Sequence, residues 1–541
     1  MKQIFTLIVA VLLLVFSFTI SFSQNKNVFA KGSDEYKMFM ANQNFNGGDY
    51  RTAVNKYKEV LKNRPNDASV HFHVGECYYM MHEYETALDE LEKAKSIDPK
   101  ATTELSLLLG KTYHAKGMLD KALDELNAYR KSVADNQKKI IDSDVDVEIA
   151  QCNVAKQLIA HPIDVKIIPL LDLNSQYDDK GPVLTNGDKT MIFTSRRPSD
   201  DKSKTDKEGD YGYFDNVYES IWNEEKKTWA SADLIRGPIN TNDGYAACSS
   251  ISSDGSTMFI YRNGQNEGRG GDIFISKKTT SGKWKSPEVL LKPVNTSYYE
   301  DAACLSPDGN TLYFVSERPG GLGRADIYTS KKTGDGWAEP VNLGAPVNTP
   351  YDENGLYLCP DGKTLFFCSD NPTSMGSYDI FKTTLGDNGK WSTPVNLGYP
   401  INSVAMESKF VMTADHQTAY ISTVRENGQG ERDIFMVDLS NYDIMKGAST
   451  VVPKSTLKGK IKGSDSTATA ISAEIRILDK ATSAQIALTK SGADGTYLIE
   501  LPANKQYILE INADGFKKFS EEIAIPSGQT LSKDIILNKN N

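Results

Sequence analysis

Three patterns of apolar and polar positions follow one another along the 541 residues of the chain. Residues 4–20 form a predominantly apolar run. Over residues 34–160, apolar positions recur with the spacing of amphipathic helices. Beyond residue 164, short apolar runs alternate with Asp-Gly and similar turn sequences, which is typical of antiparallel strands joined by hairpins. The chain is therefore predicted to combine a helical part with a longer all-β part.

The N-terminal run has the layout of a secretory signal peptide. A single lysine precedes the apolar stretch from Ile4 to Ile20, and the small residues Ser21 and Ser23 stand at positions −3 and −1 from a cut before Gln24. We expect cleavage to remove residues 1–23, and the alternative is an uncleaved membrane anchor. No later run reaches the ~18 apolar residues that cross a bilayer, so no direct membrane span is expected after cleavage.

The helical part repeats with a regular period. Each of three copies places an alanine at the same point, Ala53, Ala87 and Ala122, so successive copies are offset by nearly equal steps. Pro65 and Pro99 end the second helix of the first two copies. A period of about 34 residues with this pattern resembles the tetratricopeptide repeat. The resemblance implies helices that approach closely at the alanines, and an α-solenoid of three repeats closed by a capping helix over 34–160.

A turn sequence recurs five times in the β part, at Asn186-Gly187, Asp254-Gly255, Asp308-Gly309, Asp361-Gly362 and Asp415-His416. The last four turns are almost evenly spaced, whereas the gap between the first and the second is longer because of a charged insertion. Each turn lies between two apolar runs and therefore marks a hairpin. An Asp-Ile-aromatic unit then begins a third strand, and a stretch from Trp to Asn forms a fourth. Four strands in each period, repeated five times, predict a β-propeller.

The β repeat resembles the WD-like Pro-Asp repeat family of exported propellers, which implies five blades over residues 164–440. Val165–Leu170 looks like an isolated fourth strand, while the last copy stops after its third strand at Val437. We expect these two segments to pair and close the ring. The insertion at residues 199–210 has no apolar residue to bury, so we expect it to form a mobile surface loop.

A linker is predicted at residues 441–455 and a third unit at residues 456–541. Period-two alternation over several short runs predicts a sheet with one buried face. The motif Asp494-Gly495-Thr496-Tyr497 and the later Ala513-Asp514-Gly515-Phe516 resemble the carboxypeptidase-regulatory-like domain. This resemblance implies a small transthyretin-like β-sandwich, and it implies no peptidase activity.

Composition narrows the functional classes. Lys and Arg total 61 against 71 Asp and Glu, and the net charge of −10 argues against a nucleic-acid-binding protein. Only six His and six Cys occur, and the chain has no nucleophile elbow, zinc-protease or phosphate-loop motif. We therefore expect no enzyme activity, no cofactor and no metal site. Because no CxxC pair occurs, we expect most cysteines to be buried free thiols.

Tetratricopeptide arrays usually bind partners through the inner face of the first helix of each repeat. In the register of that family, apolar, aromatic and polar side chains alternate on this face, which suits an extended peptide or a partner helix. The alternative is that several of these side chains fill the core of the array. The candidate partner-binding residues are Met38, Asn42, Phe45, Phe72, Glu76, Tyr79, Leu107, Lys111 and His114.

Acidic residues recur just before the first strand of the blades. Because first strands border the central channel, these acids could ring one channel mouth and attract a cation; the candidates are Glu300, Asp301, Glu353 and Glu407, with Asp352 beside them. The alternative is that they pair with the backbone and with Arg196, Arg318 or Arg425 from neighbouring blades. A second acidic series, Asp272, Asp326, Asp379 and Asp433, is expected to hold the preceding loop through backbone N–H groups.

The order of the three modules resembles periplasmic proteins of the outer-membrane-protein-A-like family, one branch of which serves the type IX secretion system. The resemblance implies a non-catalytic periplasmic scaffold or adaptor for an envelope complex, with outer-membrane or secretion-system proteins as partners and outer-membrane association through those partners. The family's peptidoglycan-binding domain and lipid-bearing Cys are not found in this sequence, so peptidoglycan binding is not expected from this chain alone. The alternative is a sensor or carrier whose propeller binds a small molecule, a glycan or a cation.

Overall fold

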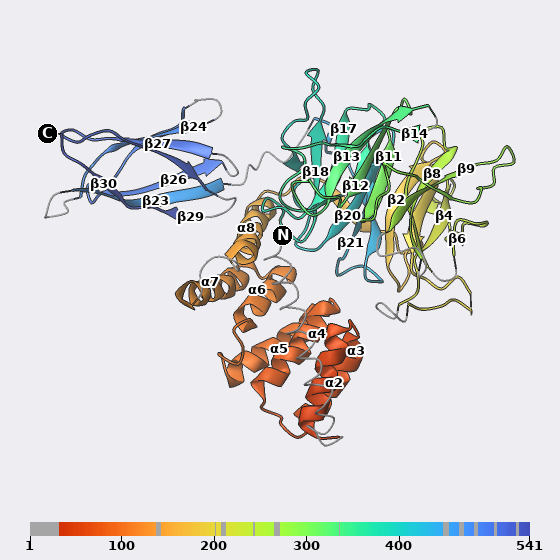
Figure 1. Cartoon of the computed structure of the whole chain (residues 1–541), viewed down its shortest axis with the longest axis horizontal. Coiled ribbons are helices and arrows are strands. Elements are labelled where there is room, and N and C mark those ends of the chain that lie inside the picture. The colour runs from red at the N-terminus through yellow and green to blue at the C-terminus, as the bar shows by residue number, and fades with distance from the viewer. Residues whose placement is uncertain are drawn as a thin grey trace, which may run out of the picture. The chain divides into compact units, whose positions relative to one another are not determined.

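The computed structural model describes residues 32–136, 142–200, 202–206, 212–241, 244–264, 271–334, 336–446, 454–464, 470–480, 485–502, 506–525 and 530–540 (Figure 1). The chain divides into two compact units, one ending at Thr112 and the other beginning at Tyr113. The predicted signal peptide and most of the predicted linker lie outside the described residues. No helix in the described ranges is long and apolar enough to cross a membrane.

The described part of the helical region contains α2 (Asp34–Asn46), α3 (Tyr50–Leu61), α4 (Ala68–Met80), α5 (Tyr84–Ile97), α6 (Leu105–Ala115), α7 (Leu119–Asn136) and α8 (Asp142–Ala160) (Figure 1). Side-chain oxygens of Ser33, Asp49 and Asp67 accept backbone N–H groups at the starts of α2, α3 and α4. Such caps satisfy donors that the first turn of a helix leaves open. Helix α6 crosses the boundary between the two units.

Small side chains let the helices approach closely, as the repeat predicts. Ala53, Ala87 and Ala122 are fully buried. A Cβ atom built on Gly75 of α4 would lie 2.6 Å from Cγ of Leu91 on α5, so these two helices meet at a point that admits only glycine without a shift. The helical region therefore resembles a tetratricopeptide array in its sequence period and in its packing.

Residues 166–438 form five antiparallel sheets within the described part of the chain. The first sheet contains β2 (Asp179–Thr185), β3 (Thr190–Ser195), β4 (Asn216–Asn223), β5 (Thr228–Trp229) and β6 (Asp233–Leu234), and the second contains β7 (Gly244–Ile251), β8 (Thr257–Gly264), β9 (Asp272–Lys277) and β10 (Glu288–Val289). The third contains β11 (Glu300–Leu305), β12 (Thr311–Ser316), β13 (Asp326–Thr333), β14 (Gly336–Trp337) and β15 (Val341–Asn342). The fourth contains β16 (Glu353–Leu358), β17 (Thr364–Ser369), β18 (Asp379–Thr384) and β19 (Val395–Asn396), and the fifth combines β20 (Glu407–Met412), β21 (Thr418–Thr423) and β22 (Asp433–Asp438) with β1 (Lys166–Pro169).

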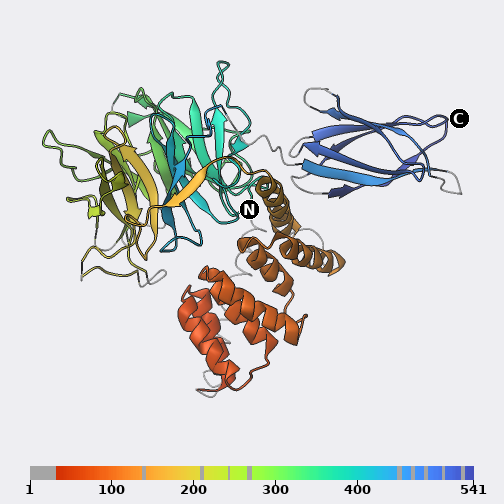
Figure 2. The same cartoon turned by 180° about the vertical axis from the view of Figure 1, so that it is seen from behind.

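The first strands of the five sheets are neighbours in a ring, in the order β2, β7, β11, β16, β20 and back to β2. This arrangement is that of a β-propeller, and Figure 2 shows the same strands from the opposite side. Strand β1 pairs with β22, from Lys166 opposite Asp438 to Pro169 opposite Phe435. The predicted pairing of the two ends of the ring is therefore confirmed.

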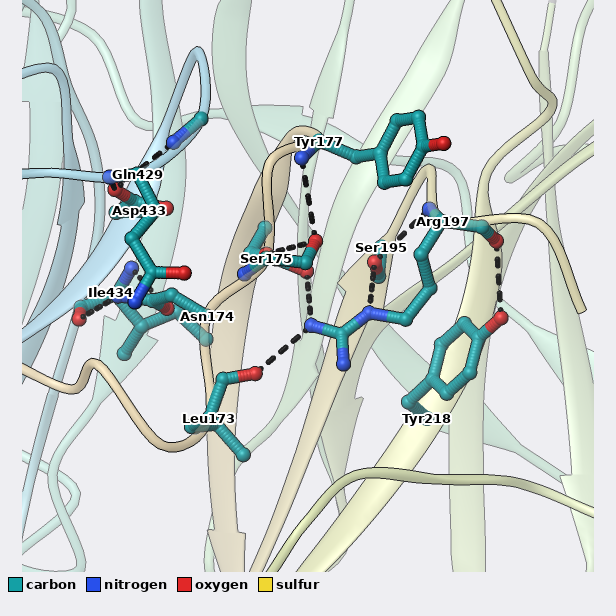
Figure 3. A network of polar contacts seen from close by, with 12 residues as sticks. Leu173, Asn174, Ser175, Tyr177, Ser195, Arg197, Tyr218, Gln429, Asp433 and Ile434 are labelled. Atoms are coloured by element: carbon teal, nitrogen blue, oxygen red, sulfur yellow. Dashed lines mark hydrogen bonds and ion pairs between the residues drawn. The ribbon is translucent and has the colours of Figure 1, made fainter.

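An asparagine side chain joins each sheet to the sheet before it. Asn348 accepts the backbone N–H of Ile327 at 3.0 Å and donates to its carbonyl oxygen at 2.9 Å. The other four clamps use the same two bonds, and they are Asn240 on Val217, Asn295 on Ile273, Asn402 on Ile380 and Asn174 on Ile434. The last of these clamps connects the two ends of the ring (Figure 3).

The charged insertion in the first sheet is not a free loop. Thr205 forms a β-bridge with Tyr213, and the buried carboxylate of Asp206 accepts a 2.7 Å hydrogen bond from the hydroxyl of Tyr245 on β7. Residues 201 and 207–211 lie outside the described part. The expectation of an unpacked loop over residues 199–210 is therefore wrong for the portion around Asp206, because an Asp without apolar neighbours in the sequence is still buried through one hydroxyl partner.

The C-terminal region forms two sheets that share one apolar core. One sheet has the order β26 (Thr496–Pro502), β23 (Lys454–Gly463) and β29 (Thr530–Ser532), with β30 (Ile535–Leu537) also on β23, and the other has the order β25 (Gln485–Lys490), β24 (Glu474–Asp479), β27 (Gln506–Asn512) and β28 (Phe519–Ala524). Buried residues from both sheets, such as Leu457 and Leu509, belong to the same cluster. The predicted alternation of buried and exposed positions is present in β26 and β27, whereas the transthyretin-like class of the sandwich and the domain boundaries stay predictions.

Replacing Gly75 with Val should destabilise the helical array. The new Cβ would meet Leu91 and the carbonyl of Ala87, and overpacking of this kind costs about 1–3 kcal/mol despite the gain in helix propensity. Thermal unfolding followed by circular dichroism measures the effect. Asn55→Val, at an exposed position of α3, is the control, and equal melting temperatures for the two variants would contradict the close approach.

Asn174→Ala should weaken the ring where its two ends meet. The change leaves the N–H and C=O groups of Ile434 without their side-chain partner, at about 1–3 kcal/mol for a buried unsatisfied group. Urea unfolding and the protease resistance of residues 164–440 report the loss. Asn310→Ala, in an exposed turn, should change stability by less than about 0.5 kcal/mol. Equal stability of the ring in Asn174→Ala and Asn310→Ala would show that the Asn174 side chain does not stabilise the junction of the two ends.

Candidate functional site

The candidates on α2 divide between the core and the surface. Met38 and Phe45 are half-buried and pack against the core cluster of α2, α3 and α4, and the ring of Phe45 meets Tyr50 edge-on at 5.3 Å. Asn42 is exposed, and its Oδ1 accepts a 2.5 Å hydrogen bond from the hydroxyl of Tyr57. For Met38 and Phe45 the structure favours the core alternative.

The candidates on α4 and α6 keep more of their surface. Phe72 and His114 are the exceptions; only 4% of Phe72 is exposed, and its ring therefore serves packing rather than partner contact. Glu76, Tyr79, Leu107 and Lys111 are half-buried. Together with Asn42, these four residues are what remains of the predicted binding face, and we call the set of five the helical surface. Their partner-binding role stays a prediction.

His114 lies in the interior, with 3% of it exposed. Its Nδ1 lies 2.7 Å from Oε1 of Glu148 on α8, and its Nε2 lies 3.0 Å from the carbonyl oxygen of Met375, in the loop between β17 and β18. The predicted role on an open face does not fit this burial. The pairing could not be found from the sequence, because the three residues are distant along the chain and Met375 contributes only backbone.

The acids at the starts of the first strands are buried and fully engaged by hydroxyl groups. Glu300 accepts the backbone N–H and hydroxyl of Thr296 at 2.8 and 2.7 Å and the hydroxyl of Ser316 at 2.7 Å. Equivalent pairs of hydroxyls bind Glu353 and Glu407, and all three acids are 0% exposed. This burial corrects the prediction of an acidic ring at an open channel mouth, since the carboxylates are satisfied from within their own sheets.

An arginine completes this arrangement in three of the sheets. Arg318 reaches Glu300 at 3.5 Å, Arg425 reaches Glu407 at 3.3 Å, and Arg197 reaches Asp179 at 2.6 Å. Each arginine also donates to a backbone carbonyl near the preceding asparagine clamp, as Arg197 does to Leu173 (Figure 3). The alternative expectation from the sequence, that these acids pair with the backbone and with arginines of neighbouring blades, needs correction in two details. Acid and arginine belong to the same sheet rather than to neighbouring ones, and Arg197 rather than Arg196 has the role in the first sheet.

Glu353 has no arginine. Asn371 occupies the position that Arg318 and Arg425 hold in their sheets, and it binds the hydroxyl of Ser369 instead. Burial without a cationic partner raises the pKa of Glu353 to about 8. The environment in the fourth sheet therefore favours the neutral form of the carboxylic acid, whereas the first, third and fifth sheets have ion pairs at this position. Asp179 and Asn371 were not among the sequence candidates, although aligning the repeats could have marked both positions.

A lysine crosses the centre of the ring. The ammonium group of Lys409 on β20 donates to the carbonyl oxygens of Ser249 on β7 and Leu356 on β16, at 3.0 and 2.6 Å. Asp301 on β11 accepts the hydroxyls of Tyr299 and Ser249. Burial raises the pKa of Asp301 and lowers the pKa of Lys409. These contacts place Asp301 in the interior of the ring rather than at an acidic mouth.

The aspartates that begin the third strands hold the loops before them, as predicted. Asp326 accepts the N–H groups of Leu322 and Gly323, Asp379 accepts that of Met375, and Asp433 accepts that of Gln429 (Figure 3). The loop before Asp272 lies outside the described residues. All six cysteines are buried and free, which confirms the prediction for them. In the described part of the chain, no group of three or more His, Cys, Asp or Glu side chains could hold a metal ion.

No protein-family model matches the chain. Solved structures that are similar to parts of it include the following three. The TPR2B-domain:pHsp70 complex of yeast Sti1 is 21% identical with a TM-score of 0.20, and the match covers 21% of this chain and 91% of that one. The TPR2AB-domain:pHSP90 complex of yeast Sti1 is 19% identical with a TM-score of 0.19, covering 22% and 46%. The periplasmic gluconolactonase PpgL of Pseudomonas aeruginosa is 11% identical with a TM-score of 0.27, covering 48% and 87%. At these TM-scores the matches carry no conclusion about partners or activity.

Glu353 should make the ring less stable as pH rises. Its folded pKa of about 8 exceeds the ordinary value of 4.5, so between these values the unfolded chain releases the proton first and the free energy of unfolding falls. The loss is at most about 1.4 kcal/mol per pH unit. Glu353→Gln removes this titration, so the stability of the variant relative to the natural chain should rise from pH 5 to pH 8 in urea titrations.

The control for this experiment is Glu300→Gln, which breaks the contact with Arg318 in a sheet that has its arginine. It should destabilise the ring in the same titrations, because a buried guanidinium loses its carboxylate. A pH-independent difference between the natural chain and Glu353→Gln would show that Glu353 ionises normally in the folded ring.

Proposed function

We propose that this protein is a non-catalytic periplasmic scaffold or adaptor for a cell-envelope complex. In this proposal the helical array binds a protein partner, the ring is a five-bladed WD-like propeller and the C-terminal sheets are a transthyretin-like sandwich of the carboxypeptidase-regulatory-like kind. The partners are envelope proteins, with outer-membrane and type IX secretion components as the candidates, and they hold the protein at the outer membrane. The signal-peptide layout of residues 1–23 supports export.

The observation that carries the proposal is the use of the ring's charged side chains. Glu300, Glu353 and Glu407 are fully buried and bound by hydroxyl groups, and the ammonium of Lys409 is bound by two carbonyl oxygens. A catalytic acid or base must reach a substrate, and these groups do not. Their arrangement supports a rigid ring that serves as a platform.

The helical surface supports the binding role. It combines an aromatic ring, an aliphatic side chain, a cation, an anion and an amide on Tyr79, Leu107, Lys111, Glu76 and Asn42. Aromatic anchors surrounded by polar groups are the usual composition of a protein-binding face. A peptide or helix of mixed polarity is therefore the partner that this surface suits.

A second candidate function rests on a cavity of about 580 Å³ between the first and second sheets. Thr185, Thr190 and Ser256 are among the residues that line it, together with Glu219 and Lys278. Such a lining suits a polar small molecule such as a short glycan. A carrier or sensor role would therefore use this cavity rather than the centre of the ring.

The double variant Tyr79→Ala, Lys111→Ala should lose partner binding with its fold intact. Truncating interface anchors typically costs about 1–3 kcal/mol each, so capture from envelope extracts should fall roughly tenfold or more. Circular dichroism and melting temperature establish that the array is folded. Lys93→Ala, at an exposed position of α5, is the matched control.

Three outcomes separate the alternatives. Partners lost by the double variant and kept by Lys93→Ala support the scaffold. Partners kept by both variants would move binding away from the helical surface. A natural chain that captures no protein, but whose melting temperature rises with added glycans, would favour the carrier.

A further inference from the structure

The joint between helix α8 and the ring lies at a loop where the ring departs from its own repeat. In the fourth sheet Asn371 replaces the arginine of the first, third and fifth sheets, and the carbonyl oxygens of Asp370 and Asn371 accept the side-chain amide of Gln151 at 2.8 and 3.3 Å. His114 binds the same loop at Met375. All of these residues belong to the second compact unit.

The geometry around His114 decides its charge. The carbonyl oxygen of Met375 can only accept, so Nε2 must carry a proton. The Nδ1 atom faces Oε1 of Glu148, whose side chain is 20% exposed and keeps access to water. The ordinary pKa of a glutamic acid is about two units below that of an imidazolium, so the proton between the two side chains stays on the imidazole of His114. Both nitrogens then donate, and the buried imidazole is a cation.

We propose that His114 is a proton-operated lock that holds α8 and the end of α6 on the β17–β18 loop. In the protonated state the imidazole of His114 bridges the carboxylate of Glu148 on α8 to the backbone carbonyl of Met375 in the fourth sheet. Loss of the Nδ1 proton would place the lone pair of Nδ1 against the Glu148 carboxylate. The contact between His114 and Glu148 would then be repulsive, while the bond from Nε2 to Met375 would remain. The joint is therefore closed at low pH and weakened at high pH.

The groups that surround His114 also favour its protonated form. Burial is the largest effect and alone would lower the pKa of His114, but hydrogen bonds with Cys152 and Glu148, together with the electrostatic effects of the same two groups, outweigh it and raise the pKa well above its ordinary value. A group with a raised folded pKa stabilises the fold below its ordinary pKa of 6.5 and loses that contribution as pH rises through the folded value. Asp379 holds the N–H of Met375 at 2.8 Å, and burial raises its pKa well above the usual range.

Two other contacts near the joint respond differently to pH. Lys116, close after His114 in the chain, forms a 3.8 Å ion pair with the almost fully exposed Glu426, which contributes little in water. Gln151 does not titrate, so its bonds to Asp370 and Asn371 persist when His114 loses its proton. We therefore expect the joint to loosen rather than to separate.

The first test measures the protonation state of the His114 imidazole in the full-length mature chain. Histidine-selective ¹⁵N labelling gives only six imidazole signals, and His114→Gln identifies the one that belongs to position 114. Two protonated nitrogens at pH 7.5 are expected. His73 is an internal comparison, since it pairs with Glu76 at 3.1 Å within one helix and is half-exposed. A singly protonated His114 ring at pH 7 would overturn the lock.

The second test measures the joint itself by hydrogen exchange at residues 370–376 and 145–158. After correction for the intrinsic pH dependence, exchange in the natural chain should rise as pH increases from 6 to 9. In His114→Gln it should be roughly tenfold faster at pH 6, corresponding to about 1.4 kcal/mol, and should depend on pH much less than in the natural chain, with Asp379 as a remaining titrating group that binds the loop. His73→Gln should behave like the natural chain.

Glu148→Gln keeps the test decisive if His114→Gln fails to fold. This variant retains His114 and the bond to Met375 but removes the carboxylate, so the pKa of His114 should fall and the rise in exchange should begin at a lower pH. Exchange that is the same in the natural chain and Glu148→Gln at every pH would show that the His114–Glu148 pair does not control the joint.

Discussion

The structure of the ring depends on how its sheets are joined, because among the described residues no strand ladder runs from one sheet into the next. The asparagine clamp meets this constraint. One amide supplies both a donor and an acceptor to the backbone of one residue in the preceding sheet, as Asn348 does for Ile327. Buried backbone groups that find no partner are costly, so each clamp both satisfies a strand and fixes the register of the next sheet. The clamp at Asn174 extends this logic to the closing joint, where packing and β1–β22 pairing act together.

Beneath the clamps lies a second set of polar contacts that the five sheets use unequally. Asp179, Glu300 and Glu407 have an arginine, whereas Glu353 has only hydroxyl and backbone donors. The second sheet has Ala246 in place of the acid, and Arg262 binds the carbonyl oxygens of Pro238 and Ile239 without a carboxylate. The arginine's contacts with backbone carbonyls are therefore more constant than the ion pair. The contact that these arginines share is therefore the one with the turn before the first strand, and neutralisation of a buried acid is added only in the sheets that have one.

Much of this fold could be predicted from the sequence because a repeat averages out local ambiguity. The almost evenly spaced turns at Asp254, Asp308, Asp361 and Asp415 located the strands, and an unpaired strand at each end predicted the closure of the ring. The site residues were less predictable. A helical register assigns a side chain to a face but does not say what covers that face, and so Phe72 was placed on a surface although it is buried. Carboxylates before first strands looked like a channel mouth because sequence does not show the hydroxyls that turn them inward.

Positions that break a repeat are where a repeat protein acquires properties of its own. A side chain that recurs in every sheet is explained by the needs of every sheet, so it says little about function. Lys409 occurs once, and it closes the centre of the ring by reaching two other first strands. Asn371 also occurs once, and its loop is the one that receives Gln151 and His114. The sheet whose buried acid has no arginine is therefore also the sheet whose loop receives helix α8, and it does so through backbone carbonyls that the side chain at position 371 does not supply.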